Sequence, residues 1–309
     1  MTKTDSTAHL LDACAELRDA SSPTPQLLDV TRSFVDDATR QGILEPTALD
    51  SLESLPPHGA AWLAVTLGSA VERGLDPSLA GARLVKIFRD WLRRTEGGSE
   101  PELMAALPTL CQALVAHLAR MEQLRTELAA DAQLGKDLEE RESESYAITW
   151  VRELLARRSG DLYVIHGETQ RVLHLQFRNV HRCYHLFSLI QSVLGNALPG
   201  GSIPNAAVAQ AARGQSDEPV TDQAWWHFQR GGHKPSMNKA VWGEESVEAL
   251  RGEDGVFTVV LWPPIMGERK WNSGFFGPTL EAAQSDMRFF GELEGDAAAT
   301  WLARAESAS

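Results

Sequence analysis

Residues 161–178 read DLYVIHGETQRVLHLQFR, and this stretch indicates how the second half of the chain folds. The run DLYVI favours a strand, and HGETQ is typical of a turn. In the second run, Leu173, Leu175 and Phe177 alternate with polar residues, as expected of a strand that buries one face. The sequence therefore predicts a β-hairpin over residues 161–178.

The residues after this hairpin predict four helices, among them a short Ala-rich one that ends at about Arg213, and one buried strand. A helix capped by Asn179 and ending at Gly195 carries an apolar stripe, and residues 256–262 (VFTVVLW) predict the strand. Closing helices are expected at 279–293 and 296–305. Because helices and strands mix without regular βαβ alternation, we predict an α+β domain with a small, largely antiparallel sheet.

Upstream of the hairpin the sequence predicts an all-helical domain. Pro25, Pro77 and Pro101 each stand where a proline can begin a helix. Two apolar rows at helical spacing lie in this region: Leu63, Leu67 and Val71, and then Leu84, Ile87, Phe88, Trp91 and Leu92. Residues from about 109 to 158 predict one nearly continuous connecting helix.

We therefore expect two domains, a helical domain at 1–158 and an aromatic-rich α+β domain at 159–309. The helical domain is interpreted as a scaffold or docking surface. Its long connecting helix is either a bundle helix that extends into solvent or a coiled-coil arm that would form a homodimer.

The net charge of the chain is −13, and both halves are acidic. This charge repels nucleic acids and anionic membranes, so we expect no general nucleic-acid binding. No apolar run is long enough for a transmembrane helix, and the N-terminus lacks the apolar core of a secretory signal. Cys14, Cys111 and Cys183 lie far apart, which favours reduced thiols in a cytoplasmic protein.

Residues 166–185 are locally basic and rich in histidine. His181 and His185 are four residues apart, so a helix would place them on one face, and His174 on the preceding strand would supply a third ligand. One interpretation of this stretch is therefore an open zinc site.

The arginines of the same stretch offer a second interpretation. Arg171, Arg178 and Arg182 would bind the phosphate or carboxylate of a small ligand. A third interpretation is a solvated polar surface, or an interface with the acidic segment 137–144. The sequence leaves these alternatives open.

A second cluster is aromatic and lies near two adjacent glycines. It contains Trp225, Trp226, His227 and His233, with Trp271 further along the chain. Aromatic rings beside backbone that a ligand can approach closely are typical of a pocket for a flat ring, a sugar or a cation. The alternative is that these tryptophans fill the core of the domain.

The sequence contains no nucleophile elbow and no serine or cysteine in a recognisable activated setting. We therefore expect a non-catalytic interaction or regulatory protein without a cofactor. Its helical domain would dock to a protein partner, and its α+β domain would recognise a peptide, a protein surface or a small ligand. The alternatives are an enzyme with a histidine-based metal or acid/base site, and a binder of a phosphorylated small ligand.

Overall fold

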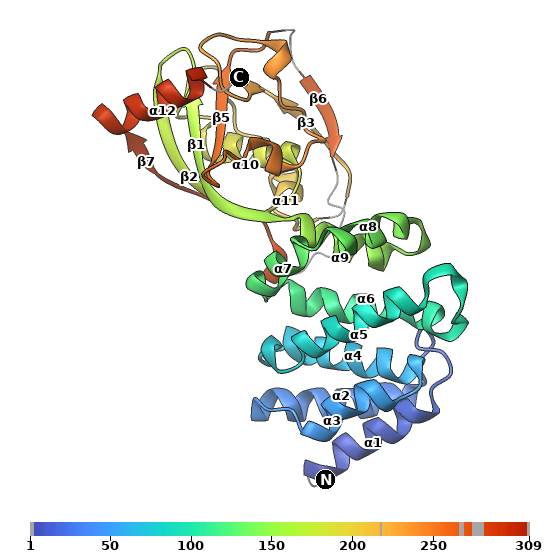
Figure 1. Cartoon of the computed structure of the whole chain (residues 1–309). Helices are drawn as coiled ribbons and strands as arrows, with labels where there is room; N and C mark the ends of the chain where they lie inside the picture. Colours follow the sequence, from blue (N-terminus) through green and yellow to red (C-terminus); the bar gives the residue numbers. More distant parts are fainter. Residues whose placement is uncertain (1–2, 217, 266–268, 274–280, 308–309) are drawn as a thin grey trace. The chain divides into compact units, whose positions relative to one another are not determined.

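The computed structural model describes residues 3–216, 218–265, 269–273 and 281–307 (Figure 1). The chain forms two compact units, Met1–Leu155 and Ala156–Ser309. The first is helical and the second combines strands with helices, which confirms the α+β class predicted from the sequence. Among the described residues, no helix is both long and apolar enough to cross a membrane.

The helical unit is built from helices that begin and end at short turns (Figure 1). They are α1 (Lys3–Glu16), α2 (Pro25–Gln41), α3 (Pro46–Ser54), α4 (Pro57–Glu72), α5 (Gly81–Arg94), α6 (Pro101–Leu118), α7 (Glu122–Ala129), α8 (Ala132–Glu140) and α9 (Tyr146–Ala156). Pro25 and Pro101 begin α2 and α6 as predicted, since a first-turn N–H needs no helical partner. Pro77 begins only a 3-10 turn, η1 (Pro77–Leu79).

Helix α4 is buried along most of its length. The predicted apolar row of Leu63, Leu67 and Val71 is fully buried on it. Gly68 lets α6 approach closely, because a Cβ at this position would lie 3.3 Å from the carbonyl oxygen of Ala113. The centre of the helical unit is therefore the tight packing of α4 on α6.

The prediction of a single helix over residues 109–158 is wrong, because α6 ends at Leu118 and three shorter α-helices follow. Asp131 accounts for one of the breaks. Its carboxylate accepts the backbone N–H groups of Gln133 and Leu134, each at 3.1 Å, and so caps the start of α8. The predicted coiled-coil arm required one continuous helix, so the structure does not support it.

The second unit contains a five-stranded sheet in the order β4-β5-β1-β2-β7 and a separate pair, β3 with β6. The strands are β1 (Arg158–His166), β2 (Arg171–Val180), β3 (Val220–Ala224), β4 (His227–Gln229), β5 (Phe257–Trp262), β6 (Arg269–Ser273) and β7 (Asp286–Leu293). β1 and β2 form the predicted hairpin, and β5 is the predicted buried strand. Within the described sheet, β1 and β5 run parallel and the other pairs are antiparallel.

Helices cover both faces of this sheet (Figure 1). α10 (Cys183–Leu194) and α11 (Ala206–Ala212) lie on one face, and α12 (Gly295–Ser307) lies on the other. Leu173, Leu175 and Phe177 bury their side chains in the core beneath α10, as the alternation predicts. Val172 points to a smaller apolar cluster beneath α12.

Asn179 does not cap α10, contrary to the prediction. It has a positive φ of 58° at the end of β2, and its side-chain amide donates to the carbonyl oxygen of Gln284 at 3.2 Å. The helix begins later, at Cys183, after an extended Arg182. Asn179 therefore connects β2 to the segment that precedes β7.

The helix predicted for 279–293 is also wrong, because residues 286–293 form strand β7 along the outer side of β2. Met287 is buried in the core of the sheet, while Phe289 and Phe290 are exposed. Pairing with β2 is a contact between distant parts of the chain, and it overrides the local pattern. The second closing helix is confirmed as α12.

Candidate functional site

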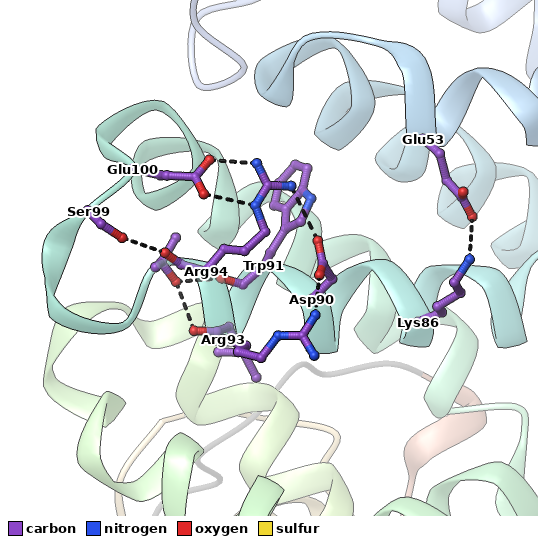
Figure 2. Close-up of polar contacts among 10 residues, drawn as sticks. Glu53, Lys86, Asp90, Trp91, Arg93, Arg94, Ser99 and Glu100 are labelled. Atoms are coloured by element: carbon purple, nitrogen blue, oxygen red, sulfur yellow. Dashed lines mark hydrogen bonds and ion pairs between the residues drawn. The ribbon is translucent and has the colours of Figure 1, made fainter.

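A groove of about 860 Å³ lies in the helical unit beside α5. Its lining residues come from α3, α4, α5 and α6 and from the turn between α3 and α4: Leu52, Glu53, Leu55, Pro57, Ala82, Val85, Lys86, Ile87, Arg89, Asp90, Trp91, Arg93, Arg94 and Leu103. Figure 2 shows the polar contacts of α5 at this site. Helix α5 supplies most of the lining and therefore determines the chemistry of the groove.

Helix α5 has the sequence GARLVKIFRDWLRR and is strongly two-sided. Leu84 and Phe88 are buried in the unit, whereas Lys86 and Arg93 are exposed. Apolar residues at helical spacing hold the helix against its neighbours, and the basic residues remain at the surface. The helix is thus anchored on one side and presents a row of cations on the other.

The C-terminal end of α5 is fixed by Arg141. Its guanidinium donates to the Thr95 hydroxyl at 2.6 Å and to the carbonyl oxygen of Leu92 at 3.3 Å. A cation that binds the last carbonyl groups of a helix also interacts favourably with the helix dipole. These contacts hold the last turn of α5, which carries Arg93 and Arg94.

The turn after α5 brings an acid back beside the helix. Gly97 and Gly98 adopt φ values of 71° and 76°, which glycine accepts without strain. The Ser99 hydroxyl donates to the carbonyl oxygen of Arg94 at 2.8 Å. Glu100 then accepts two hydrogen bonds from the Arg94 guanidinium, at 2.6 and 2.9 Å (Figure 2).

The floor of the groove is apolar. Leu52 of α3, Val85 and Trp91 of α5 and Leu103 of α6 all line it, and each is less than a tenth exposed. Burial of further apolar surface on such a floor contributes roughly 25 cal/mol per Å². The floor is therefore apolar, with a small exposed area on each of these side chains.

The edges of the groove are ionic. Four basic residues and two acidic residues are among the described lining residues. The pairs at the edge join Lys86 to Glu53 at 3.1 Å, Arg89 to Asp131 at 2.7 Å, Arg93 to Asp90 at 2.6 Å and Arg94 to Glu100 at 2.6 Å. Because all of these side chains are partly exposed, each pair contributes only about 0–1 kcal/mol to stability.

Arg94 is the most firmly held of these cations. Besides its two hydrogen bonds to Glu100, it donates to Asp90 at 3.3 Å. The hydrogen bonds from Arg94 hold the pKa of the Glu100 carboxyl below its usual range. The turn and the end of α5 are thereby joined into one small charged cluster.

This groove is not among the sites predicted from the sequence, although the sequence carries one signal for it. The segment 81–94 carries five basic residues and one acidic residue in a chain whose net charge is −13. The apolar row predicted on this segment is buried. A local reversal of charge on an amphipathic helix would have indicated an interaction surface.

The structure does not gather the three arginines predicted to bind an anion. Arg171 and Arg178 lie seven residues apart on β2, which separates their Cα atoms by about 23 Å. Arg171 is bound to Glu292 at 2.7 Å, and Arg182 donates to a backbone carbonyl oxygen at 3.0 Å. Arg178 is exposed. These side chains therefore do not converge on one small anion.

The three histidines predicted to bind zinc are not brought together either. His174 lies on β2 with its Nε2 atom 2.9 Å from Asp161 and its ring stacked on Tyr163. His181 precedes α10, so its four-residue spacing to the buried His185 does not place both on one helical face. Among the described residues, no group of three or more histidine, cysteine or acidic side chains is placed to hold a metal ion.

The aromatic cluster divides between core and surface. Trp226 is fully buried, and its indole N–H donates to the carbonyl oxygen of Pro199 at 3.0 Å. His227 is also buried, with Nε2 3.1 Å from the carbonyl oxygen of Ser236. Trp225 is half-buried. Two of the predicted pocket residues are thus part of the interior of the domain.

The remaining two predicted pocket residues are His233 and Trp271. His233 is exposed in the loop after β4. Trp271 lies on β6 opposite Asp222 of β3, and its side chain is outside the described part of the structure.

A buried polar contact joins α10 to β3. The Ser188 hydroxyl donates to the Asp222 carboxylate, and both side chains are buried. Burial raises the pKa of the Asp222 carboxyl, while the hydrogen bond from Ser188 opposes that rise. The Gln191 side chain on the same helix donates to the carbonyl oxygen of Gln223 at 3.2 Å. This cluster ties the β3–β6 pair to the core.

Comparison of the chain with protein-family models, with curated proteins and with solved structures finds no match.

Proposed function

We propose that this is a non-catalytic interaction protein whose helical unit binds a segment of a partner protein in the groove beside α5. The observation that carries the proposal is the combination of an apolar floor with a charged edge in one groove of about 860 Å³. Grooves between helices commonly receive a short amphipathic segment, whose apolar residues fill the floor while its polar residues meet the edge.

Charge complementarity specifies the partner further. The described lining of the groove carries more basic than acidic residues, although the chain as a whole has a net charge of −13. Each of these lining cations already pairs with an acid at the edge, so the partner segment would bind by exchange. Its acidic groups replace these acids, and its apolar anchor contacts Val85 and Trp91. A long polyanion such as a nucleic acid would be repelled by the remaining surface.

The cysteines support a cytoplasmic location as part of the same proposal. Cys14, Cys111 and Cys183 are buried and form no disulfide. Burial raises the pKa of the Cys14 thiol to about 12, so this thiol stays protonated at neutral pH. Buried reduced thiols are typical of proteins from reducing compartments.

The proposal is tested by placing a photo-crosslinking residue at Ala82, an exposed residue that lines the groove. Ala105 on α6 is also exposed and lies outside the described lining, so it serves as the matched control. We expect position 82 to crosslink to an acidic segment of a protein that, once purified, binds the full chain. Equal crosslinking of that protein from both positions, or a partner segment without acidic residues, would contradict the proposal.

A further inference from the structure

We infer that Lys86 and Arg93 determine which partner segment binds in the groove. Such a segment must carry two acidic groups about 10 Å apart. This inference rests on the proposed docking function and assigns the specificity of that groove. Both residues line the groove and stand on the same helix (Figure 2).

Exposure separates these two cations from the other two at the edge. The side chains of Lys86 and Arg93 are 74% and 76% exposed. Those of Arg89 and Arg94 are 47% and 46% exposed. The first pair is therefore more accessible to a carboxylate that approaches from solvent.

The existing ion pairs separate Lys86 and Arg93 from Arg94 but not from Arg89, which also has one side-chain contact, with Asp131. Within the described part of the chain, the Lys86 side chain contacts Glu53 and the Arg93 side chain contacts Asp90, whereas Arg94 makes three hydrogen bonds to Asp90 and Glu100. A partner carboxylate that displaced both Glu100 and Asp90 from Arg94 would break all three. One that takes Lys86 or Arg93 breaks one exposed contact, which stabilises the fold little.

The exchange also leaves no buried charge behind. When Arg93 turns to a partner, Asp90 keeps its hydrogen bond to Arg94. When Lys86 turns to a partner, the Glu53 side chain, which is 47% exposed, is solvated by water. The partner thus gains two charge-assisted contacts at a small cost to the unit.

The spacing of the two cations defines the partner. Lys86 and Arg93 are seven residues apart, so they lie on nearly the same face of α5 and about 10 Å apart along its axis. Two acids seven residues apart on a partner helix match this distance, as do two acids three residues apart on an extended segment. The apolar anchor lies between or beside them, over the groove floor.

The test is a selection of peptides from a random library on the full-length protein, followed by affinity measurements on variants. The variants are Lys86→Gln and Arg93→Gln, alone and combined. The matched control is Arg32→Gln with Arg40→Gln, because these arginines of α2 are similarly exposed and pair with aspartates three residues away. Ala82→Trp is included to fill the groove itself.

We expect the selected peptides to contain two acids at one of the two spacings. Each single variant should weaken their binding about threefold and the double variant roughly tenfold, while the control pair binds as wild type. When the peptide glutamate that pairs with Lys86 is replaced by glutamine, Lys86→Gln should no longer weaken binding. The same should hold for Arg93→Gln and the glutamate that pairs with Arg93.

Two outcomes would overturn the inference, and they differ in what they leave standing. In the first, the peptides lose binding to Ala82→Trp but bind Lys86→Gln and Arg93→Gln as tightly as wild type. This result would disprove the role of Lys86 and Arg93 in specificity and leave the docking function intact. If no selected peptide distinguishes wild type from Ala82→Trp, both the inference and the docking function fail.

Discussion

The Lys86 ammonium on α5 lies 3.1 Å from the Glu53 carboxylate on α3, and both side chains line the same groove. The pair joins two helices, yet both partners are largely exposed to solvent. Such a contact adds little to stability and is easily exchanged for another. This relationship makes the edge of the groove suited to reversible binding.

Replacement of Glu53 by glutamine should therefore leave the fold almost unchanged. We expect the unfolding free energy to change by less than about 1 kcal/mol, so the melting temperature should shift by no more than about 4 °C. Differential scanning calorimetry measures this shift. Asp29→Asn, which removes the exposed partner of Arg32 on α2, is the matched control. A much larger loss for Glu53→Gln alone would mean that the pair is structural.

The contact between Ser188 and Asp222 should behave in the opposite way, because it is buried. Ser188→Ala should destabilise the protein by about 1–3 kcal/mol at pH 7, since it leaves a buried carboxylate short of a donor. Ser192→Ala is the control, because its hydroxyl on the same helix donates only to a backbone carbonyl in the described contacts. Urea unfolding of both variants checks this; equal losses would contradict it.

The pKa of Asp222 adds a pH dependence to the same experiment. Burial raises this pKa in the folded state, so the ionised carboxylate costs stability above that pKa, and the cost disappears as the pH falls towards the unfolded value. The penalty of Ser188→Ala should shrink over this acidic range. In the Asp222→Asn background, the penalty should no longer vary with pH. A penalty that is constant with pH in the native background would exclude an ionised Asp222.

His117 should make the helical unit less stable in mild acid. Burial lowers the pKa of this histidine, whose Nδ1 atom lies 3.0 Å from the carbonyl oxygen of Ala113. The unfolded chain therefore binds the proton more readily than the folded one. Stability is fully present above the unfolded pKa of about 6.5 and falls as the pH drops below it, by at most about 1.4 kcal/mol per pH unit.

Unfolding curves at a series of pH values test this prediction through the slope rather than through absolute stability. His117→Gln should flatten the slope between about pH 6.5 and pH 5. His9→Gln, which replaces an exposed histidine on α1, should not. Burial also lowers the pKa of His166, so a smaller slope of the same sign should persist in His117→Gln. An unaltered slope in His117→Gln would show that His117 does not titrate as the burial implies.

Trp226 should act as a core residue. Trp226→Phe removes the indole hydrogen bond to Pro199 and leaves a cavity beside Phe228, so we expect a loss of about 1–3 kcal/mol. Trp242 is 47% exposed, and Trp242→Phe should change stability by no more than about 0.5 kcal/mol. Thermal unfolding compares the two. A stable Trp226→Phe protein would reopen the interpretation of Trp226 as a ligand-binding residue.

Local patterns in the sequence were sufficient for the parts of the fold that depend on near neighbours. The alternation of Leu173, Leu175 and Phe177 predicted β2 correctly, because one buried face imposes it directly. For residues 286–293 the local sequence predicted part of a helix, and this prediction was wrong. Their strand depends on pairing with β2, more than a hundred residues away in sequence, and no local spacing records that contact.

The groove beside α5 could not be predicted from the sequence for a related reason. Its floor combines Leu52, Val85 and Leu103, which come from three different helices. The sequence could reveal the basic row on α5, but not that α3 and α6 would leave a hollow beside it. The predicted zinc site failed because the start of α10 lies two residues beyond His181, which separates that residue from the helical face of His185.

The dissociation constant of one library-selected peptide for wild type, Ala82→Trp and Ala105→Trp tests the central claim most directly. Isothermal titration on the full-length protein gives all three values. If the groove beside α5 is the docking site, Ala82→Trp should weaken binding by roughly tenfold or more, and Ala105→Trp should bind as wild type. Equal affinities for all three proteins would contradict the claim that this groove receives the partner.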